Sequence, residues 1–248
     1  MLHFGIIGKP LAQSFSARFF NEKFAAEGID AEYSLYPLSR MDEFPALIDN
    51  LRERFAPDGE LRGFNVTIPY KTAVIPYLSE LDETAKAIGA VNVIRFFPDG
   101  RTVGYNSDAL GFMESLSANP TLPQKALILG TGGAAKACMF GLGKLGIEAT
   151  YVSRTPREGQ LGYDNLPVEN YGLIVNCTPL GMFPNTEEFP PIDYSRLTKA
   201  QFLYDCIYNP EETVFLRRGR ERGCRTQNGT QMLLGQARAA WKIWTNAN

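Results

Sequence analysis

The segment KALILGTGGAAK, residues Lys125–Lys136, decides the fold because it joins an apolar strand, a glycine-rich turn and the start of a helix. Gly130 suits the tight turn, and Gly132 would let a pyrophosphate approach the backbone closely. Backbone amides at the start of the following helix stabilise negative charge. Ala135 holds the third position of this fingerprint, where alanine is accepted. Because no Gly-Lys-Ser/Thr sequence follows, the segment predicts a dinucleotide site rather than a nucleoside triphosphatase.

The strand expected next, residues 148–154, ends with Ser153 and Arg154, and Thr155 follows. A strand that binds NAD usually ends in a carboxylate, which accepts the ribose hydroxyls. A carboxylate would repel the 2′-phosphate of NADP, whereas an arginine pairs with it. Arg154, with Arg157 nearby, therefore favours NADP. The alternative is an exposed arginine in a solvated loop.

Short apolar runs alternate with amphipathic stretches along the chain, which predicts an α/β fold with a largely parallel sheet. Strands are expected at residues 3–8, 31–38, 63–68, 90–97, 125–130, 148–154, 172–178 and 201–207. The segment PDG, residues 98–100, predicts a turn that leads from the fourth of these strands into a further one. Helices are expected at residues 16–27, 42–55, 82–88, 107–119 and 135–145, and after Gly229. The apolar residues of the last helix fall on one face, which predicts core packing.

The composition is that of a globular protein of one or two domains, with 248 residues of which 44% are hydrophobic. Its 25 basic and 27 acidic residues give a net charge of -2. No overall positive field therefore favours nucleic acid or anionic lipid, and a nucleic-acid partner is not expected.

The four cysteines lie far apart in the sequence, with no CxxC pair, and His3 is the only histidine. A structural zinc site is therefore not expected. The sequence starts without a basic segment followed by a long apolar run, and no stretch of about 18 apolar residues occurs. These features predict a reduced, cytoplasmic protein.

Polar residues follow the expected strands of the first half. Ser14 and Ser16 come after the first strand and a Gly-Lys-Pro turn, where one serine could cap the next helix. Thr67 lies near the end of the third expected strand, and Lys71 lies just beyond it. An isolated lysine is usually a solvated charge, but opposite a fixed aspartate it could exchange a proton with a substrate hydroxyl. Asp108 is the candidate partner, and capping the next helix is its alternative role.

Nine motifs occur in the order and approximate spacing found in shikimate dehydrogenases, and they span nearly the whole chain. They are GKPLAQSFS, GFNVTIPYK, GAVNV, GYNSDALGF, GTGGAAK, SRT, NCTPLGM, YDCIYNP and NGTQMLLGQA. The chain thus resembles the shikimate and quinate dehydrogenase family. The resemblance implies a reversible, NADPH-dependent reduction of 3-dehydroshikimate to shikimate, in the route to chorismate and the aromatic amino acids.

The resemblance also implies two domains. Residues 1–107 and 229–248 would form an α/β substrate-binding domain, to which the C-terminal helix returns. Residues 108–228 would form a Rossmann-type NADP-binding domain. The expected partner is a small-molecule substrate, without nucleic acid or membrane, and the expected state is a monomer or homodimer.

Residue roles follow from the same resemblance. Lys71 and Asp108 match the family's catalytic pair. The residues that match substrate contacts are Ser14, Ser16, Thr67, Asn92, Tyr208 and Gln236. The residues that match cofactor contacts are Gly130, Thr131, Gly132, Gly133, Ala134, Ser153, Arg154, Thr155, Cys206 and Gly229. No metal ligand is implied.

The chain departs from the family's usual pattern in three places. Ser153 stands where asparagine is usual, and Arg157 comes earlier than the family's second arginine. Cys177 replaces a commoner alanine. The segment between the second and third strands of the second half is brief, so a helix found there in relatives is expected to be absent.

Two alternative functions remain open at this stage. One is the oxidation of quinate with NAD by a relative within the family. The other is a nucleotide-binding relative without catalysis, which would have no reason to keep both Lys71 and Asp108.

Overall fold

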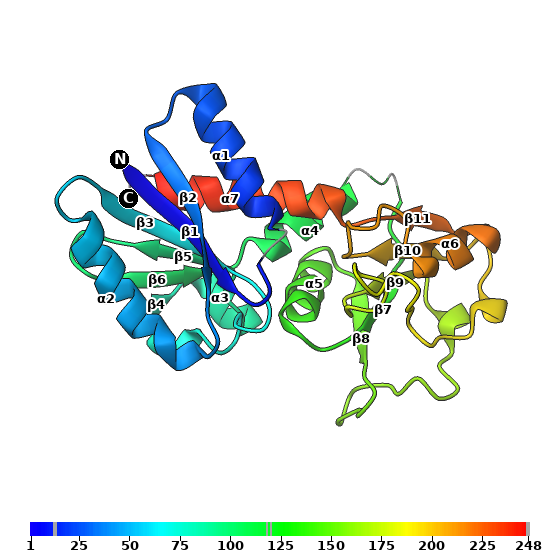
Figure 1. The fold of residues 1–248 in the computed structure, drawn as a ribbon. Helices are drawn as coiled ribbons and strands as arrows, with labels where there is room; N and C mark the ends of the chain where they lie inside the picture. Colours follow the sequence, from blue (N-terminus) through cyan, green and yellow to red (C-terminus); the bar gives the residue numbers. More distant parts are fainter. Residues whose placement is uncertain (12–13, 118, 120, 247–248) are drawn as a thin grey trace. The chain divides into compact units, whose positions relative to one another are not determined.

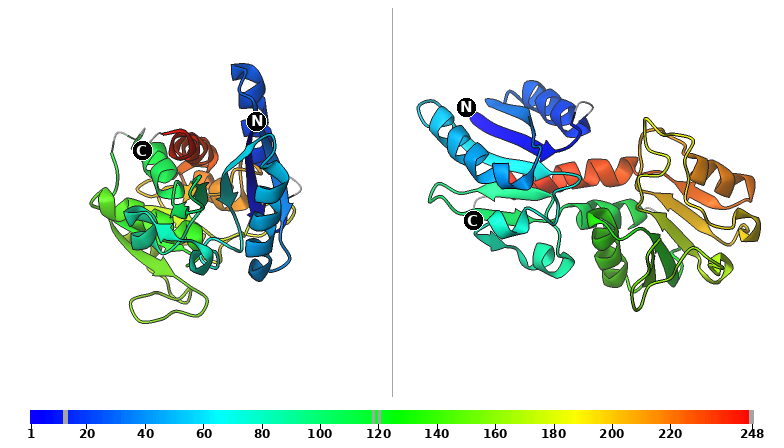
Figure 2. Two further views of the ribbon diagram at one scale, coloured as in Figure 1. Left: turned by 90° about the vertical axis from the view of Figure 1, so that its left-hand side faces the viewer. Right: turned by 60° about the horizontal axis from the view of Figure 1, so that its bottom comes forward.

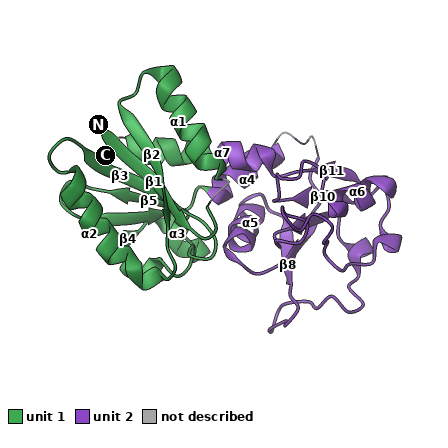
Figure 3. Cartoon of the chain, in the orientation of Figure 1, with its two compact units in different colours: residues 1–107, 237–248 green, residues 108–236 purple. Residues whose placement is uncertain are grey.

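The chain forms two compact units, each with its own sheet (Figure 3). The computed structural model describes residues 1–11, 14–117, 119 and 121–246. Unit 1 comprises Met1–Ser107 and Ala237–Asn248, and unit 2 comprises Asp108–Gln236.

Unit 1 is built on a six-stranded mixed sheet in the order β2-β1-β3-β5-β6-β4 (Figure 1). Its strands are β1 (Leu2–Gly8), β2 (Ala31–Pro37), β3 (Glu60–Val66), β4 (Glu80–Leu81), β5 (Val93–Phe96) and β6 (Thr102–Tyr105). β1 pairs in parallel with β2 and β3, and β4 pairs in parallel with β6. β5 runs antiparallel to both β3 and β6. The carboxyl ends of β1 and β3 therefore lie at the same edge of the sheet.

Helices cover both faces of this sheet. They are α1 (Phe15–Glu27), α2 (Phe44–Phe55), α3 (Glu83–Ile88), the 3-10 turns Met41–Glu43 and Ile75–Tyr77, and the end of α7 (Thr230–Thr245). Ile7 of β1 belongs to the core cluster that contains Ile48 of α2. Ile6 belongs to a second cluster, with Phe20 of α1 and Trp244 of α7. Because successive strand residues point to opposite faces, α2 lies on one face and α1 and α7 on the other (Figure 1; Figure 2).

Trp244 anchors α7 to the unit 1 sheet. Its side chain is fully buried, and its indole nitrogen donates a hydrogen bond to the carbonyl oxygen of Ile94 at 2.9 Å. A Cβ atom on Gly63 of β3 would lie 2.1 Å from that nitrogen. A glycine inside the strand is therefore required by the approach of the indole ring.

Unit 2 is built on a five-stranded parallel sheet in the order β11-β10-β9-β7-β8. Its strands are β7 (Lys125–Leu129), β8 (Glu148–Val152), β9 (Leu173–Asn176), β10 (Phe202–Asp205) and β11 (Arg225–Gln227). Residues of β7 alternate between two core clusters, so the strand is buried on both faces, as its continuous apolar run predicts. The chain moves from β7 to β8 on one side and then crosses to β9 on the other. The carboxyl ends of β7 and β9 thus border the switch point where open α/β sheets bind ligands.

Helices also cover both faces of the unit 2 sheet. They are α4 (Asp108–Ser117), α5 (Gly133–Lys144), α6 (Val214–Glu221), the start of α7, and the 3-10 turns Val168–Asn170 and Tyr194–Arg196. Phe112 of α4 and Leu142 of α5 belong to one core cluster, and Phe215 of α6 belongs to the other. Residues 153–172, all described, form a 3-10 turn and no α-helix between β8 and β9. This agrees with the brevity of that segment in the sequence.

The predicted α/β class is confirmed, with one mixed sheet and one parallel sheet of the Rossmann type. Each predicted strand and helix overlaps an observed element, although Ala118, within the predicted helix 107–119, lies outside the described residues. Three observed elements were not predicted from the sequence, namely β4, β11 and α6, and each is short. The observed division also differs from the predicted one, because residues 229–236 group with unit 2 and not with unit 1. Within the described chain, no helix combines the length and apolar character needed to cross a bilayer.

Gly63→Ala should destabilise unit 1, because the added methyl group would overlap the buried indole of Trp244. We expect a loss of about 1–3 kcal/mol in the free energy of unfolding, measured by urea denaturation. Gly143→Ala in α5 is the matched control, because a Cβ atom there meets nothing within 4 Å. Its stability should be unchanged or slightly raised, and equal losses in the two variants would contradict the role given to the indole contact.

Candidate active site

The glycine turn after β7 leaves its backbone open. Gly130 has a φ of 103°, a left-handed conformation that favours glycine, and its amide donates to the carbonyl oxygen of Val152 at 2.9 Å. Gly132 has an ordinary φ of -75°, and a Cβ atom on it would meet nothing within 4 Å. Neither its backbone angles nor its neighbours in the chain explain the glycine at position 132. Close approach of a pyrophosphate to the backbone, as predicted from the sequence, would explain it.

The helix that follows this turn suits an anion. α5 begins at Gly133, spans 12 residues and carries no acidic residue in its first turn. Thr131 and Gly132, directly before it, are exposed. The free amides and the positive end of the helix dipole therefore face no competing carboxylate from that turn.

The end of β8 carries the residues predicted to select the cofactor. The hydroxyl oxygen of Ser153 accepts a hydrogen bond from the amide of Thr155 at 3.2 Å, which shapes the loop. Arg154 between them is exposed, as is Arg157. This donor set, with no carboxylate at the strand end, fits a dinucleotide that carries a 2′-phosphate.

A buried carboxyl group organises the carboxyl ends of β9 and β10. Asp205 is fully buried, and its Oδ1 accepts hydrogen bonds from the Asn176 amide group at 3.1 Å and the Ile207 backbone amide at 3.0 Å. Its Oδ2 accepts from the Thr213 hydroxyl at 2.6 Å. The Thr213 hydroxyl oxygen in turn accepts from the amide of Leu216 and so caps α6. Burial raises the pKa of Asp205 to about 7 despite these donors.

Two predicted cofactor residues meet beside this carboxyl group. The amide of Gly229 donates to the carbonyl oxygen of Ile207 at 2.9 Å. A Cβ atom on Gly229 would lie 2.2 Å from the carbonyl oxygen of Cys206, so only glycine fits. Tyr208, predicted to contact the substrate, is 38% exposed on the same loop.

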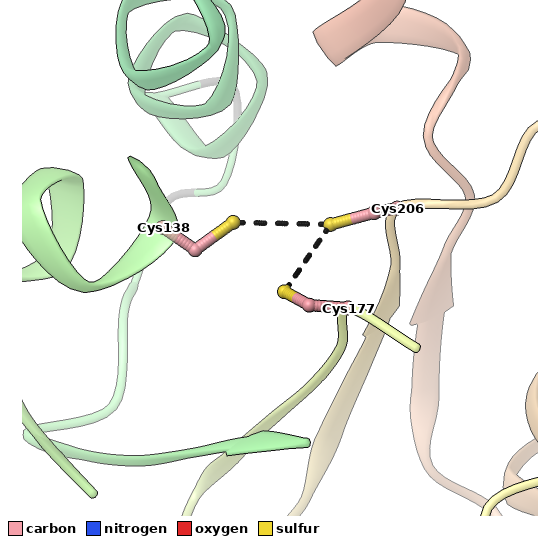
Figure 4. Close-up of side chains that lie close together, drawn as sticks. All are labelled: Cys138, Cys177 and Cys206. Atoms are coloured by element: carbon pink, nitrogen blue, oxygen red, sulfur yellow. Dashed lines mark hydrogen bonds between the residues drawn. The ribbon is translucent and has the colours of Figure 1, made fainter. Parts of the chain in front are cut away.

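Three of the four cysteines converge in unit 2 (Figure 4), which the sequence did not predict. The sulfur atom of Cys206 lies 3.6 Å from that of Cys177 and 3.8 Å from that of Cys138. All three sulfur atoms lie within 4.8 Å of one another, and all four cysteines are free thiols. The wide sequence spacing that argued against a zinc site therefore says nothing about their distance in space.

α4 and α7 cross at two glycines within unit 2. A Cβ atom on Gly111 would lie 2.4 Å from the Met232 carbonyl oxygen, and one on Gly235 would lie 2.9 Å from the Gly111 Cα. Asp108 stands one turn before Gly111, at the start of α4, and its side chain is buried. Gln236 of α7 is also buried, and its side-chain amide donates to the Leu233 carbonyl oxygen at 3.1 Å.

In unit 1, a chain of hydrogen bonds joins several predicted substrate residues. Ser16 is hydrogen-bonded to the hydroxyl of Tyr33, which donates to Asn65 Oδ1 at 2.7 Å. The Asn65 side chain donates to the Asn92 carbonyl oxygen at 3.2 Å. Asn92 then donates to the Ser107 hydroxyl at 2.9 Å and accepts from the Ser107 amide at 2.7 Å. Ser107 ends the first segment of unit 1 and directly precedes Asp108.

The remaining predicted residues of unit 1 lie around the ends of β1 and β3. The amide of Thr67 donates to the Ile7 carbonyl oxygen at 3.0 Å, and a Cβ atom on Gly8 would meet the Thr67 methyl group at 2.2 Å. The Lys71 carbonyl oxygen accepts from the amide of Val91 at 2.7 Å, and the lysine is half-buried. Ser14 immediately precedes α1 but makes no capping hydrogen bond with its side chain. Lys71 thus belongs to unit 1, and Asp108 to unit 2.

Several residues that position this site were not predicted from the sequence. Tyr33 and Ser107 connect the unit 1 network, and Asn176 and Asp205 connect the unit 2 network. Asn176 and Asp205 each end an otherwise apolar strand. A polar residue at that position is the signal that could have identified them, since buried polar groups require partners.

The fold and this site define a dinucleotide-dependent oxidoreductase of the Rossmann type. Residues 6–94 match the family described as the shikimate dehydrogenase substrate binding domain. A shikimate dehydrogenase (NADP+) of Carboxydothermus hydrogenoformans is 38% identical, over 98% of this chain and 91% of that protein. The chain therefore belongs to the shikimate dehydrogenase family.

Solved structures support the same relationship across both units. The shikimate 5-dehydrogenase of Thermus thermophilus in complex with NADP(H) and shikimate is 30% identical, with a TM-score of 0.85 over 99% of this chain and 94% of that chain. A quinate dehydrogenase of Corynebacterium glutamicum in complex with NAD is 28% identical, with a TM-score of 0.84 over 98% and 93%.

The buried carboxyl group of Asp205 should make stability depend on pH. Its pKa of about 7 in the folded protein exceeds the ordinary value of 3.8, so folding favours the protonated form. This contribution to stability is complete below about pH 4 and is lost as the pH rises toward about 7. We expect the free energy of unfolding to fall over this range more steeply in the wild type than in Asp205→Asn.

Urea denaturation of both proteins at a series of pH values measures this difference. Asn at position 205 keeps the shape and the acceptor oxygen, so loss of fold is not expected. Identical pH dependence in the two proteins would show that Asp205 is ionised in the folded state throughout.

Proposed function

We propose that this chain catalyses the reversible, NADPH-dependent reduction of 3-dehydroshikimate to shikimate, within chorismate and aromatic amino acid biosynthesis. The observation that carries the proposal is the 38% identity to a shikimate dehydrogenase (NADP+) over 98% of this chain. Lys71 and Asp108 of this chain lie in the motifs that match the family's catalytic pair. The open backbone at Gly132 and the exposed Arg154 support NADP as the cofactor.

NADP would be held by unit 2. The proposed contacts are Gly130, Thr131, Gly132, Gly133, Ala134, Ser153, Arg154, Thr155, Cys206 and Gly229. The turn and the start of α5 would bind the pyrophosphate through backbone amides, and Arg154 would pair with the 2′-phosphate. When bound, the reduced cofactor supplies a hydride to the ketone carbon of the substrate. Asp205 would act indirectly, by fixing the loop that carries Cys206.

The substrate is a hydroxylated ring acid, and the proposed contacts suit its groups. These contacts are Ser14, Ser16, Thr67, Asn92, Tyr208 and Gln236. Hydroxyl groups can both donate and accept hydrogen bonds, which matches a polyol. The buried network from Ser16 to Asn92 supports this role, because it restricts the orientation of both side chains.

Lys71 and Asp108 would perform the proton transfer. As charge grows on the carbonyl oxygen during reduction, the Lys71 ammonium group would stabilise it and donate the proton. Asp108 would orient the lysine and accept a hydrogen bond from a neighbouring substrate hydroxyl. In the oxidation direction, Lys71 would take the proton from the hydroxyl group of shikimate.

Unit 1 would supply Ser14, Ser16, Thr67 and Asn92 to the substrate, and unit 2 would bind the cofactor and supply Tyr208 and Gln236. We further propose a cytoplasmic enzyme that acts as a monomer or homodimer without a nucleic-acid or membrane partner. The net charge of -2 and the four free cysteines support this assignment.

Oxidation of quinate with NAD is the second candidate function. The likeness to the NAD-bound quinate dehydrogenase favours it, as does Ser153 in place of the family's usual asparagine. The exposed Arg154, with no strand-end carboxylate, favours NADP.

A spectrophotometric assay tests the proposal directly. The purified protein should form NADPH when shikimate is the only alcohol and NADP+ the only oxidant. Quinate and NAD+ are tested in the same assay, in all four combinations. Preference for quinate with NAD+ would establish the second candidate, and no turnover in any combination would favour a relative without catalysis.

Arg154→Ala should raise the Michaelis constant for NADP+ much more than that for NAD+. Losing a charge-assisted contact to the 2′-phosphate costs about 1.5–3 kcal/mol, which corresponds to a factor of roughly ten to a hundred or more. Arg157→Ala, on the same loop, shows whether the second arginine shares this contact. Equal effects of Arg154→Ala on both cofactors would remove Arg154 from the cofactor site.

Lys71→Met should lower kcat by about 10²–10⁴-fold with little change in substrate affinity, because it removes the proton donor but keeps the apolar stem. Asp108→Asn should lower kcat as well and also weaken substrate binding. The double variant should be little worse than the poorer single variant if the two residues act as a unit. Steady-state kinetics and NADP+ titrations measure these effects. Near-normal kcat in a folded Lys71→Met protein would contradict the catalytic role and indicate that Lys71 is a solvated surface charge.

A further inference from the structure

Cys177 and Cys206 directly follow two neighbouring parallel strands. Asn176, which ends β9, and Asp205, which ends β10, are register partners, and each cysteine is the next residue in the chain. Neighbouring strands lie about 4.7–4.9 Å apart, within the range of about 4.4–6.8 Å between the Cα atoms of a disulfide. The two sulfur atoms are already 3.6 Å apart. Rotation of the side chains, with little backbone movement, would therefore bring them into bonding distance.

The thiols of this cluster differ in exposure and acidity. Cys177 and Cys206 are partly exposed, whereas Cys138 is fully buried. The thiols of Cys138 and Cys206 lower the pKa of Cys177 to about 6, while burial raises the pKa of Cys138 well above its ordinary value. Thiolates are the reactive form of cysteine. Cys177 is thus suited to be the attacking sulfur and Cys206 the sulfur that closes the bond.

We propose that Cys177 and Cys206 form a modification site at which hydrogen peroxide produces a reversible disulfide. In the first step, the Cys177 thiolate attacks one oxygen of the peroxide. The O–O bond breaks, an S–O bond forms, and hydroxide leaves, so that sulfur is oxidised by two electrons to sulfenic acid. In the second step, the Cys206 sulfur attacks the Cys177 sulfur; the S–O bond breaks, the S–S bond forms, and the thiol proton leaves with the hydroxyl group as water.

The surroundings of the cluster favour this chemistry over metal binding. The three cysteines pack in the apolar cluster that contains Phe112 and Tyr204. A divalent ion held by three thiolates would carry a net negative charge into that cluster, close to the carboxyl groups of Asp108 and Asp205, which already oppose ionisation of Cys177. A disulfide is neutral and carries no such desolvation cost.

Peptide mapping of the peroxide-treated full chain, without NADP, tests the site. The reduced protein is exposed to hydrogen peroxide, its remaining thiols are blocked with iodoacetamide, and its mass is measured. We expect the loss of two hydrogen atoms and of two blocked thiols, a peptide pair linked through Cys177 and Cys206, and full reversal by dithiothreitol. Cys177→Ser should abolish the linked pair.

Two further variants serve as matched controls, with circular dichroism confirming their fold. Cys224 donates to the Thr198 carbonyl oxygen at 3.1 Å and lies outside the cluster, so Cys224→Ser should form the disulfide as the wild type does. Cys138→Ser should also keep it. The proposal is overturned if neither the wild type nor Cys138→Ser yields the Cys177–Cys206 pair. It is equally overturned if the disulfide joins Cys138 to Cys206, or if Cys224 oxidises as fast as Cys177.

Discussion

The hydrogen bonds of the buried Asp205 carboxyl group hold together the carboxyl ends of β9 and β10 in unit 2. This carboxyl group joins Asn176 at the end of β9, Ile207 after β10 and Thr213 at the start of α6. Without these donors, a carboxyl group in this apolar interior would be costly in free energy, and without the carboxyl group the three donors would lack their acceptor. The network therefore fixes both loops that follow the central strands, including the one that carries Cys206 and Tyr208.

A comparable constraint operates in unit 1, where the polar residues form a continuous chain rather than a single centre. Tyr33 and Asn65 link Ser16 to Asn92, and Asn92 holds Ser107 through two hydrogen bonds. Each group depends on its neighbours for a hydrogen-bond partner, so the side chains proposed to bind the substrate have little freedom to reorient. Preorganisation of this kind reduces the entropy lost when a polyol binds.

Glycines allow backbone segments to pass close to one another near these networks. Gly229 lets the chain pass against the Cys206 carbonyl oxygen, and Gly111 lets α4 and α7 touch. Gly132 differs from both, because no protein atom requires it. This lack of a steric requirement agrees with the pyrophosphate contact proposed for Gly132.

Much of the architecture was predictable from the sequence because it depends on local pattern. The period-two and continuous apolar runs located eight strands, and the turn at Gly130 identified the dinucleotide unit. The sequence motifs around Lys71, Asp108 and Arg154 also suggested catalytic and cofactor roles, and these roles stay predictions. The short elements β4, β11 and α6 were not found, since two to eight residues carry too little periodicity.

Only the tertiary structure decided which distant residues meet. Cys138, Cys177 and Cys206 give no sequence signal, yet the pairing of β9 with β10 and the packing of α5 bring their sulfur atoms within 4.8 Å. The pairing of Asp205 with Asn176 was likewise not predictable from the sequence, because it depends on the register of β9 and β10. Register and helix packing depend on the summed burial of many side chains, and no single motif carries that information. The sequence by itself thus determined the fold class and the candidate site residues. The tertiary structure determined the contacts that orient those residues.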